Sequence, residues 1–217
     1  MKALKRIIAL LIIFATLTVC LASCGKKTPS VGYTEDTSTE KKDYYYVAMV
    51  VEDHGTIIVK LDAVYAPKTT ANFIKLVREG FYNGLTFHRV IENFMIQGGD
   101  PKADGTGGSS EKIEGEFIAN GVFNPIEFKR GTIAMARSSA SMDSASSQFF
   151  ICNSSSTSVS YLYGQYAAFG EVVEGIEVVD SITAATAGYG DSNGTIANKR
   201  KQAVITMMMV IEYEETK

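Results

Sequence analysis

The segment Phe87-His88-Arg89-Val90-Ile91-Glu92-Asn93-Phe94-Met95-Ile96-Gln97-Gly98-Gly99-Asp100-Pro101 decides the predicted fold of this chain. Its β-branched, aromatic and apolar residues predict two short strands, at about 86–90 and 94–98. A second block, Ser147-Gln148-Phe149-Phe150-Ile151, begins about sixty residues later and predicts another strand over 148–152. Both blocks carry polar side chains within apolar strands, which indicates a site as well as a core.

Strand alternation assigns each side chain of the first block to a face. Phe87 and Arg89 are expected on one face, with His88 and Val90 on the other. Because this alternation places His88 opposite Arg89, His88 is interpreted as a buried, hydrogen-bonded structural histidine. Cys152 lies inside an apolar strand without a disulfide partner and is interpreted as a buried structural thiol.

The same alternation applies to the next strand and to the second block. Met95 and Gln97 share a face of their strand. Gln148 and Phe150 share a face that is expected beside a groove, while the alternate residues of that block point into the interior. The side chains on these faces are therefore candidates for one site.

Composition limits the classes of function. The chain has 217 residues, enough for one domain with appendages, and is 46% hydrophobic and 21% charged. A net charge of −3 argues against a nucleic-acid partner. With two histidines and three cysteines, no zinc-type cluster can be assembled, so neither a metal nor a cofactor is expected.

The N-terminus has the pattern of an export signal. A basic start, Met1–Arg6, precedes an apolar run, Ile7–Leu21. A run of ~15 residues fits a signal-peptide core and is short for a membrane span of ~20 residues, although an uncleaved anchor helix is the alternative. Leu21-Ala22-Ser23 directly before Cys24 resembles the bacterial lipoprotein cleavage box, which implies a diacylated Cys24 that anchors the mature chain to the membrane.

These patterns give three segments. Residues 1–23 are predicted to be the signal peptide, and residues 24–43 the lipidated cysteine followed by a polar, flexible tether. Residues 44–217 are predicted to form the folded domain.

Within that domain, short strands predominate. A hairpin is expected over 46–61, a helix from Pro67 to near Gly80, and a second short helix near Gly175–Ile182. Further strands are expected near 132–136, 168–172 and 204–213. This pattern predicts a mainly β domain and leaves an antiparallel sandwich and a closed barrel equally possible.

The two blocks resemble the signature segments of the cyclophilin family of peptidyl-prolyl isomerases. The resemblance covers about Tyr46 to Tyr213 and includes Gly80-Phe81-Tyr82, Gly131–Arg137 and Ala168-Phe169-Gly170. It favours a closed eight-stranded antiparallel β-barrel capped by two α-helices. It also implies cis/trans isomerisation of X-Pro bonds, a reaction with a barrier of ~18–20 kcal/mol that needs no cofactor.

The resemblance also implies roles for individual residues. Arg89 would place a cation near the prolyl nitrogen and stabilise its lone pair as the amide twists. The other catalytic residues would be Phe94, Gln97 and Phe150. The substrate-binding residues would be Met95, Ala136, Arg137, Gln148, Tyr161, Leu162 and Tyr166.

The chain departs from the family pattern at three groove positions. Arg137 stands where many members have asparagine, Tyr161 where many have tryptophan, and Tyr166 where many have histidine. The segment Ala184–Arg200 matches the family poorly, and Asp191–Gly194 within it is interpreted as a turn.

The sequence thus predicts a monomeric, lipid-anchored, extracytoplasmic isomerase on the bacterial cell membrane. Its partners would be proline-containing unfolded or secreted polypeptides, whose slow X-Pro steps it would accelerate. The alternative is a non-catalytic binding module, such as a chaperone or adhesin, using the same groove. The presence of Arg89 together with the groove residues favours the enzyme.

Overall fold

The structure is a computed structural model that describes residues 32–214. The predicted signal peptide and the predicted lipidation at Cys24 lie outside the described residues. Among those described, no helix has both the length and the apolar character needed to cross a membrane.

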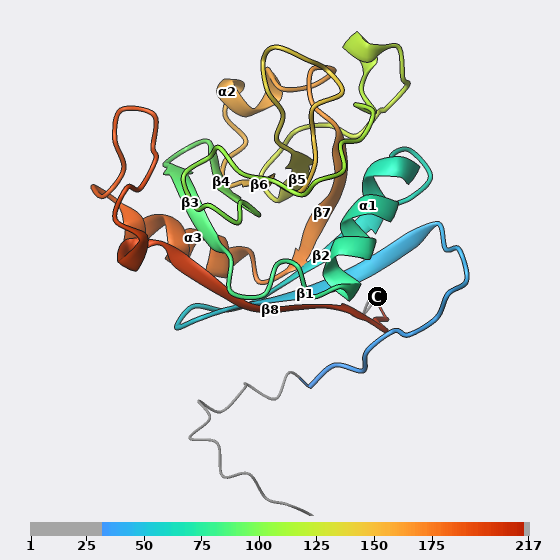
Figure 1. Cartoon of the computed structure of the whole chain (residues 1–217), viewed down its shortest axis with the longest axis horizontal. Helices are drawn as coiled ribbons and strands as arrows, with labels where there is room; N and C mark the ends of the chain where they lie inside the picture. Colours follow the sequence, from blue (N-terminus) through green and yellow to red (C-terminus); the bar gives the residue numbers. More distant parts are fainter. Residues whose placement is uncertain (1–31, 215–217) are drawn as a thin grey trace, which may run out of the picture. The chain divides into compact units, whose positions relative to one another are not determined.

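Eight strands close into one antiparallel barrel (Figure 1). Their order around the barrel is β1-β2-β7-β5-β6-β4-β3-β8. The predicted closed barrel is therefore confirmed. The strands are β1 (Tyr44–Val51), β2 (Gly55–Asp62), β3 (Thr86–Ile91), β4 (Met95–Gly98), β5 (Thr132–Met135), β6 (Phe149–Cys152), β7 (Ala168–Glu174) and β8 (Ala203–Ile211).

Both predicted helices are present, α1 (Pro67–Arg78) and α3 (Ile176–Thr186), and they lie on opposite sides of the barrel (Figure 1). Proline occupies the first turn of α1, where its missing N–H costs no hydrogen bond. Gly80 just beyond the helix adopts a φ of 68°, which favours glycine. The sequence did not predict the one-turn helix α2 (Thr157–Ser160) or the 3₁₀ turns η1 (Ile118–Asn120) and η2 (Lys199–Lys201).

The core joins the barrel interior to the two helices. The ring of Phe73 in α1 lies 4.9 Å from that of Tyr82, 5.5 Å from Phe149 and 5.1 Å from Phe169. All four side chains are buried. Burying each such side chain contributes roughly 1.5–3 kcal/mol, so this cluster is a major source of stability. From α3, the core receives Val178, Val179 and Ile182.

Strand β3 contains an irregularity that changes the predicted faces. Its register with β4 shifts between Phe87 and Arg89. Phe87 belongs to the barrel core and Val90 packs against it. Arg89 instead contacts Met95 outside the barrel. The prediction that Phe87 and Arg89 share a face is therefore wrong, because the extra residue of a bulge reverses the alternation.

His88, at that irregularity, is fully buried. Burial lowers the pKa of its imidazole, and the nearby Arg89 acts in the same direction, although Asp100, Asp104 and the Thr86 backbone oppose the shift. Neither ring nitrogen has a partner in hydrogen-bond geometry within residues 32–214. The predicted burial is confirmed, and the predicted hydrogen bonding stays a prediction.

The segment before β1 is not free chain where the structure describes it. Glu35 forms a β-bridge with Ile211, the Asp36 N–H donates to Val210 O at 2.9 Å, and the Glu212 N–H donates to Thr34 O at 2.9 Å. Residues 34–36 therefore add backbone hydrogen bonds to the end of β8. Part of the predicted tether is docked on the barrel, while the proposed domain boundaries stay a prediction.

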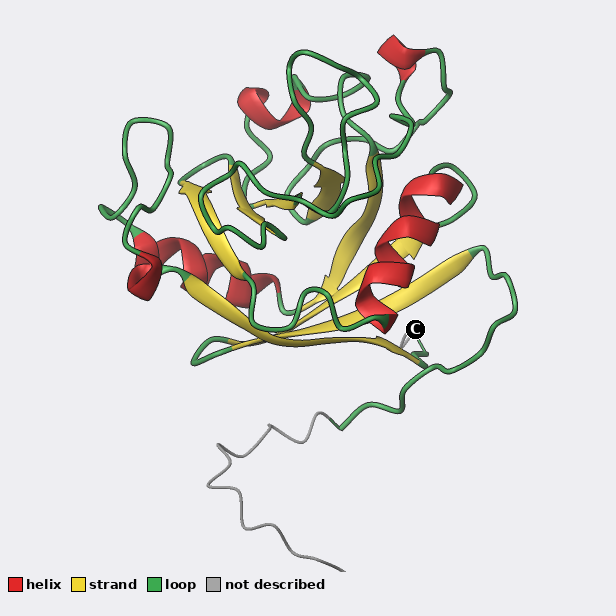
Figure 2. Cartoon of the chain, viewed as in Figure 1, coloured by secondary structure: helices red, strands yellow, loops and turns green. Residues whose placement is uncertain are grey.

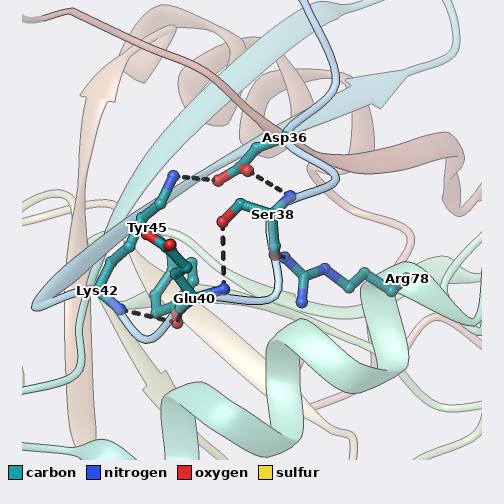
Figure 3. A network of polar contacts seen from close by, with 6 residues as sticks. All are labelled: Asp36, Ser38, Glu40, Lys42, Tyr45 and Arg78. Atoms are coloured by element: carbon teal, nitrogen blue, oxygen red, sulfur yellow. Dashed lines mark hydrogen bonds and ion pairs between the residues drawn. The ribbon is translucent and has the colours of Figure 1, made fainter.

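A polar network holds this docked segment, as Figure 3 shows. The Asp36 carboxylate, 4% exposed, accepts hydrogen bonds from Lys42 Nζ at 2.6 Å and from the Ser38 N–H at 2.9 Å. Arg78 of α1 donates to Ser38 O at 2.6 Å. Burial opposes ionisation of Asp36, but the bonds from Lys42 and Ser38 outweigh it and lower the pKa of the carboxyl.

We predict that Asp36→Asn destabilises the protein by about 1 kcal/mol at pH 7, because it removes a charged acceptor whose Lys42 partner is partly exposed. The folded pKa of Asp36 is below the unfolded value, so its contribution is present above about pH 4 and disappears as pH falls through the folded pKa. Urea unfolding at several pH values measures the difference. Glu40→Gln, in the same segment, is the matched control. A difference between Asp36→Asn and wild type that stays constant down to the lowest pH would contradict this account.

Candidate active site

Three adjacent strands bring the predicted site together. In the ladders, Arg89 of β3 pairs with Gln97 of β4, and Gln97 pairs with Phe150 of β6. Met95 and Gln97 lie outside the barrel while Ile96 between them is in the core, as alternation predicted. In β6 and the residue before it, Gln148 and Phe150 face the groove.

A chain of hydrogen bonds runs across these strands. Arg89 Nη1 donates to Gln97 Oε1 at 3.1 Å, and Gln97 Nε2 donates to Gln148 Oε1 at 2.8 Å. Gln148 Nε2 then donates to Gly105 O at 3.0 Å and to Gly107 O at 2.7 Å. Each amide is thus oriented by its neighbours, and the guanidinium is held at the end of the chain.

A second contact holds Arg89 from the opposite direction. Its Nε donates to Asn193 O at 2.7 Å. No acceptor within residues 32–214 pairs with Nη2, so that nitrogen is free to meet a ligand. Burial lowers the pKa of Arg89, and the nearby Tyr166 and Asp191 oppose the shift. An arginine nevertheless stays charged across the physiological range.

Beside the guanidinium lies an apolar floor. Phe150 stacks on Phe128 with 6.2 Å between ring centroids and meets Tyr166 edge-on at 5.9 Å. Arg89 Nη1 also lies 3.7 Å from the sulfur of Met95. The partly buried side chains on this cluster include Phe94, Ala136, Leu162 and Tyr166.

Arg137 is fixed at one edge of the groove. Its Nε donates to Gln165 O at 3.1 Å and its Nη1 donates to Ser138 O at 3.1 Å. The guanidinium carbon lies 4.8 Å from the centre of the Tyr166 ring. This cation–π contact uses the tyrosine that stands where the family often has histidine.

Tyr161 is the exception among the predicted site residues. Its side chain is 84% exposed and is not part of the apolar cluster. The structure does not bring it together with the others, and its role in substrate binding stays a prediction.

Several residues of the site were not predicted. Phe128 supports Phe150 from a segment without a signature motif. The turn after Asp191 was expected, but not that it delivers the Asn193 carbonyl to Arg89. The Asp191 carboxylate builds this turn by accepting from the N–H groups of Asn193 at 2.8 Å and Thr195 at 2.9 Å.

Asp100 shapes the loop that carries the two glycine carbonyls. Its buried carboxylate accepts from the N–H groups of Lys102 at 2.7 Å and Gly105 at 2.6 Å. Burial opposes ionisation, but these backbone bonds outweigh it and lower the pKa of the carboxyl. The sequence signal for this loop was a turn-forming acidic residue, Asp100, directly before Pro101.

The described residues offer no other reactive centre at the groove. Cys152 is buried beneath it, and burial raises the pKa of its thiol to about 12, as expected for a structural cysteine. Within residues 32–214, no three His, Cys, Asp or Glu side chains gather as metal ligands. What the groove provides is a fixed cation and two amides beside an apolar seat. Such a set can bind a peptide and polarise an amide nitrogen.

Comparison with known proteins gives a consistent result. The family model for cyclophilin type peptidyl-prolyl cis-trans isomerase/CLD matches residues 46–209. A peptidyl-prolyl cis-trans isomerase of Helicobacter pylori is 41% identical over 62% of this chain and 78% of its own length. Isomerase B of Escherichia coli is 42% identical over 63% of this chain and 83% of its own length.

A solved structure agrees. The Cryptosporidium parvum cyclophilin type isomerase, crystallised in the presence of the dipeptide Ala-Pro, superposes with a TM-score of 0.66 at 27% identity. The match covers 77% of this chain and 99% of that one. This chain belongs to the cyclophilin-type peptidyl-prolyl cis-trans isomerases. It is an enzyme of that class, and the substrates of such an isomerase are proline-containing peptides.

We predict that kcat/KM is nearly flat, changing by less than about twofold between pH 6 and 8, because no group in the groove is expected to change charge there. Burial lowers the pKa of His88, so its titration moves toward or beyond the acid end of this window. A protease-coupled or direct absorbance assay with a proline peptide measures the profile. An inflection that disappears in His88→Gln but persists in His54→Gln, a control in the half-buried β1–β2 turn, would contradict the structural role given to His88.

Proposed function

We propose that this isomerase rotates X-Pro bonds in the groove of β3, β4 and β6, with Arg89 as the main catalytic residue. The observation that carries the proposal is the guanidinium held by Gln97 and Asn193 with Nη2 left free beside the apolar floor. Phe94, Met95, Phe150 and Leu162 would seat the proline ring.

The chemistry follows from the barrier. Partial double-bond character of the amide opposes rotation and disappears as the nitrogen becomes pyramidal. A donor aimed at that nitrogen gains strength only in the twisted state, so it accelerates rotation and does more than tighten binding. Gln97 would act mainly by holding Arg89 in place. Gln148 would hold the substrate backbone, and Ala136 and Arg137 would line its path.

We also propose that the enzyme works outside the cytoplasm, anchored by lipid on Cys24. The support is the basic start, the apolar run and the Leu21-Ala22-Ser23-Cys24 quartet. The clients would be secreted or surface chains whose X-Pro steps otherwise take tens of seconds. We expect it to act as a monomer.

Arg89→Ala should lower kcat/KM by at least tenfold, since losing one transition-state donor costs roughly 2.7–4 kcal/mol. Arg89→Lys should recover only part of the loss, because lysine keeps the charge without the planar fork. The measurement is turnover of a proline peptide by the full-length protein, with thermal unfolding to verify the fold. Arg200→Ala, an exposed arginine of η2, is the control. Wild-type turnover by a folded Arg89→Ala protein would remove the assignment.

Cys24→Ala should shift the protein from the membrane fraction to the soluble fraction or leave an unprocessed precursor, because the anchor needs the thiol. Cell fractionation followed by detergent-phase partitioning measures this. Cys20→Ala, inside the predicted signal peptide, is the control and should leave the distribution unchanged. A processed Cys24→Ala protein that still partitions into detergent would show that the anchor lies elsewhere.

A further inference from the structure

A hollow of about 390 Å³ adjoins the groove. It shares Gln97, Ala136, Arg137 and Gln148 with the groove, so a peptide bound beside Arg89 can place a flanking side chain in it. The rest of its wall is polar and includes Lys112 and Ser146.

The wall of the hollow carries two cations and no carboxylate. Carboxylates close to it in sequence have other partners. Glu111 pairs with Lys75 at 2.7 Å, and Glu114 pairs with Lys68. Asp143 accepts from Asn120 Nδ2 at 2.8 Å and from the Gly115 N–H at 3.0 Å. The positive charge facing the hollow is therefore left uncompensated by its own wall.

Both cations are available to a ligand. Arg137 is held through Nε and Nη1 and stacks on Phe117 at 5.3 Å and Tyr166 at 4.8 Å, which leaves Nη2 without an acceptor in the described part of the chain. The exposed Lys112 ammonium has no hydrogen bond or ion pair within residues 32–214. An arginine held in this way loses little side-chain entropy when it binds a carboxylate.

We propose that Lys112 and Arg137 are specificity-determining residues that favour X-Pro substrates with an acidic side chain near the proline. The carboxylate enters the hollow while the proline occupies the apolar floor. The ligand is an Asp or Glu of the substrate itself, because the hollow and the groove share four wall residues. The inference rests on the proposed function in one respect, that the peptide lies along this groove.

The test uses the full-length protein and neutral proline peptides in which one flanking position carries Glu, Gln or Lys. The position is scanned from three residues before the proline to two after it. At low ionic strength, kcat/KM for Glu should exceed that for Gln by about two- to fivefold at one position or more, the range of a partly exposed ion pair, with Lys below Gln. The ratio should approach one in 1 M salt.

Variants locate the effect. Lys112→Gln should reduce the Glu-to-Gln ratio, and Lys112→Gln with Arg137→Asn should bring it close to one. The Gln peptide is an internal reference, so a general disturbance of the groove through Tyr166 cancels in the ratio. Lys129→Gln, which removes a cation paired with Glu171 at 3.1 Å outside the hollow, should keep the wild-type ratio.

Two results would overturn the inference: a Glu-to-Gln ratio of one at every position, or a ratio that persists in the double variant. Either can occur with normal turnover of the Gln peptides, in which case the proposed function stands. Loss of turnover of every peptide by the wild type would instead remove the proposed function.

Discussion

The pleat of β4 and β6 is the constraint on which both the core and the groove depend. Each strand has only four residues, and alternation divides them between two environments. Ile96, Phe149 and Ile151 fill the barrel, while Met95 and Phe150 form the apolar floor outside it. A shift of one residue in register would exchange these sets, so packing of the core also positions the groove.

Burial holds the floor, and hydrogen bonds hold the charge above it. Arg89 has several rotatable bonds, and fixing them costs conformational entropy. Hydrogen bonds offset this loss of entropy. Arg89 donates to Gln97 and to the Asn193 carbonyl, and Gln97 is itself held by Gln148, with distances of 2.7–3.1 Å. A guanidinium already in place needs no reorganisation when the amide twists, which is how fixed dipoles and charges contribute to catalysis.

The loop over 100–107 extends this organisation beyond the strands (Figure 2 draws the connecting loops in green). The Asp100 carboxylate accepts hydrogen bonds from backbone N–H groups of the loop. The loop in turn places the carbonyls of Gly105 and Gly107 where they accept hydrogen bonds from Gln148. A β-carbon at Gly107 would lie 2.0 Å from Asp100 Oδ1, so the close approach requires glycine there. The buried Asp100 carboxylate therefore fixes the loop, and the loop fixes the side chain of Gln148 in the groove.

Much of the fold and of the groove was predictable from the sequence, wherever the local pattern of residues determines the structure. Regular alternation gave the correct faces for Gln97 and Phe150, and the resemblance to cyclophilins resolved barrel from sandwich. The prediction that Phe87 and Arg89 share a face was wrong because nothing in the sequence around His88 reveals a bulge. The docking of residues 34–36 was missed because their polar composition is that of a linker, while their stability comes from β8, far away in sequence. Contacts such as Asn193 to Arg89 depend on tertiary packing and have no local signal.

The central claim is that Gln97 acts mainly by holding Arg89. A double-mutant cycle on kcat/KM tests it most directly. Gln97→Ala should reduce kcat/KM by roughly tenfold in the wild-type protein and by less than about twofold in an Arg89→Ala background, because residues that act as a unit are not additive. An equal reduction in both backgrounds would contradict the account and show that Gln97 acts on the substrate independently of Arg89.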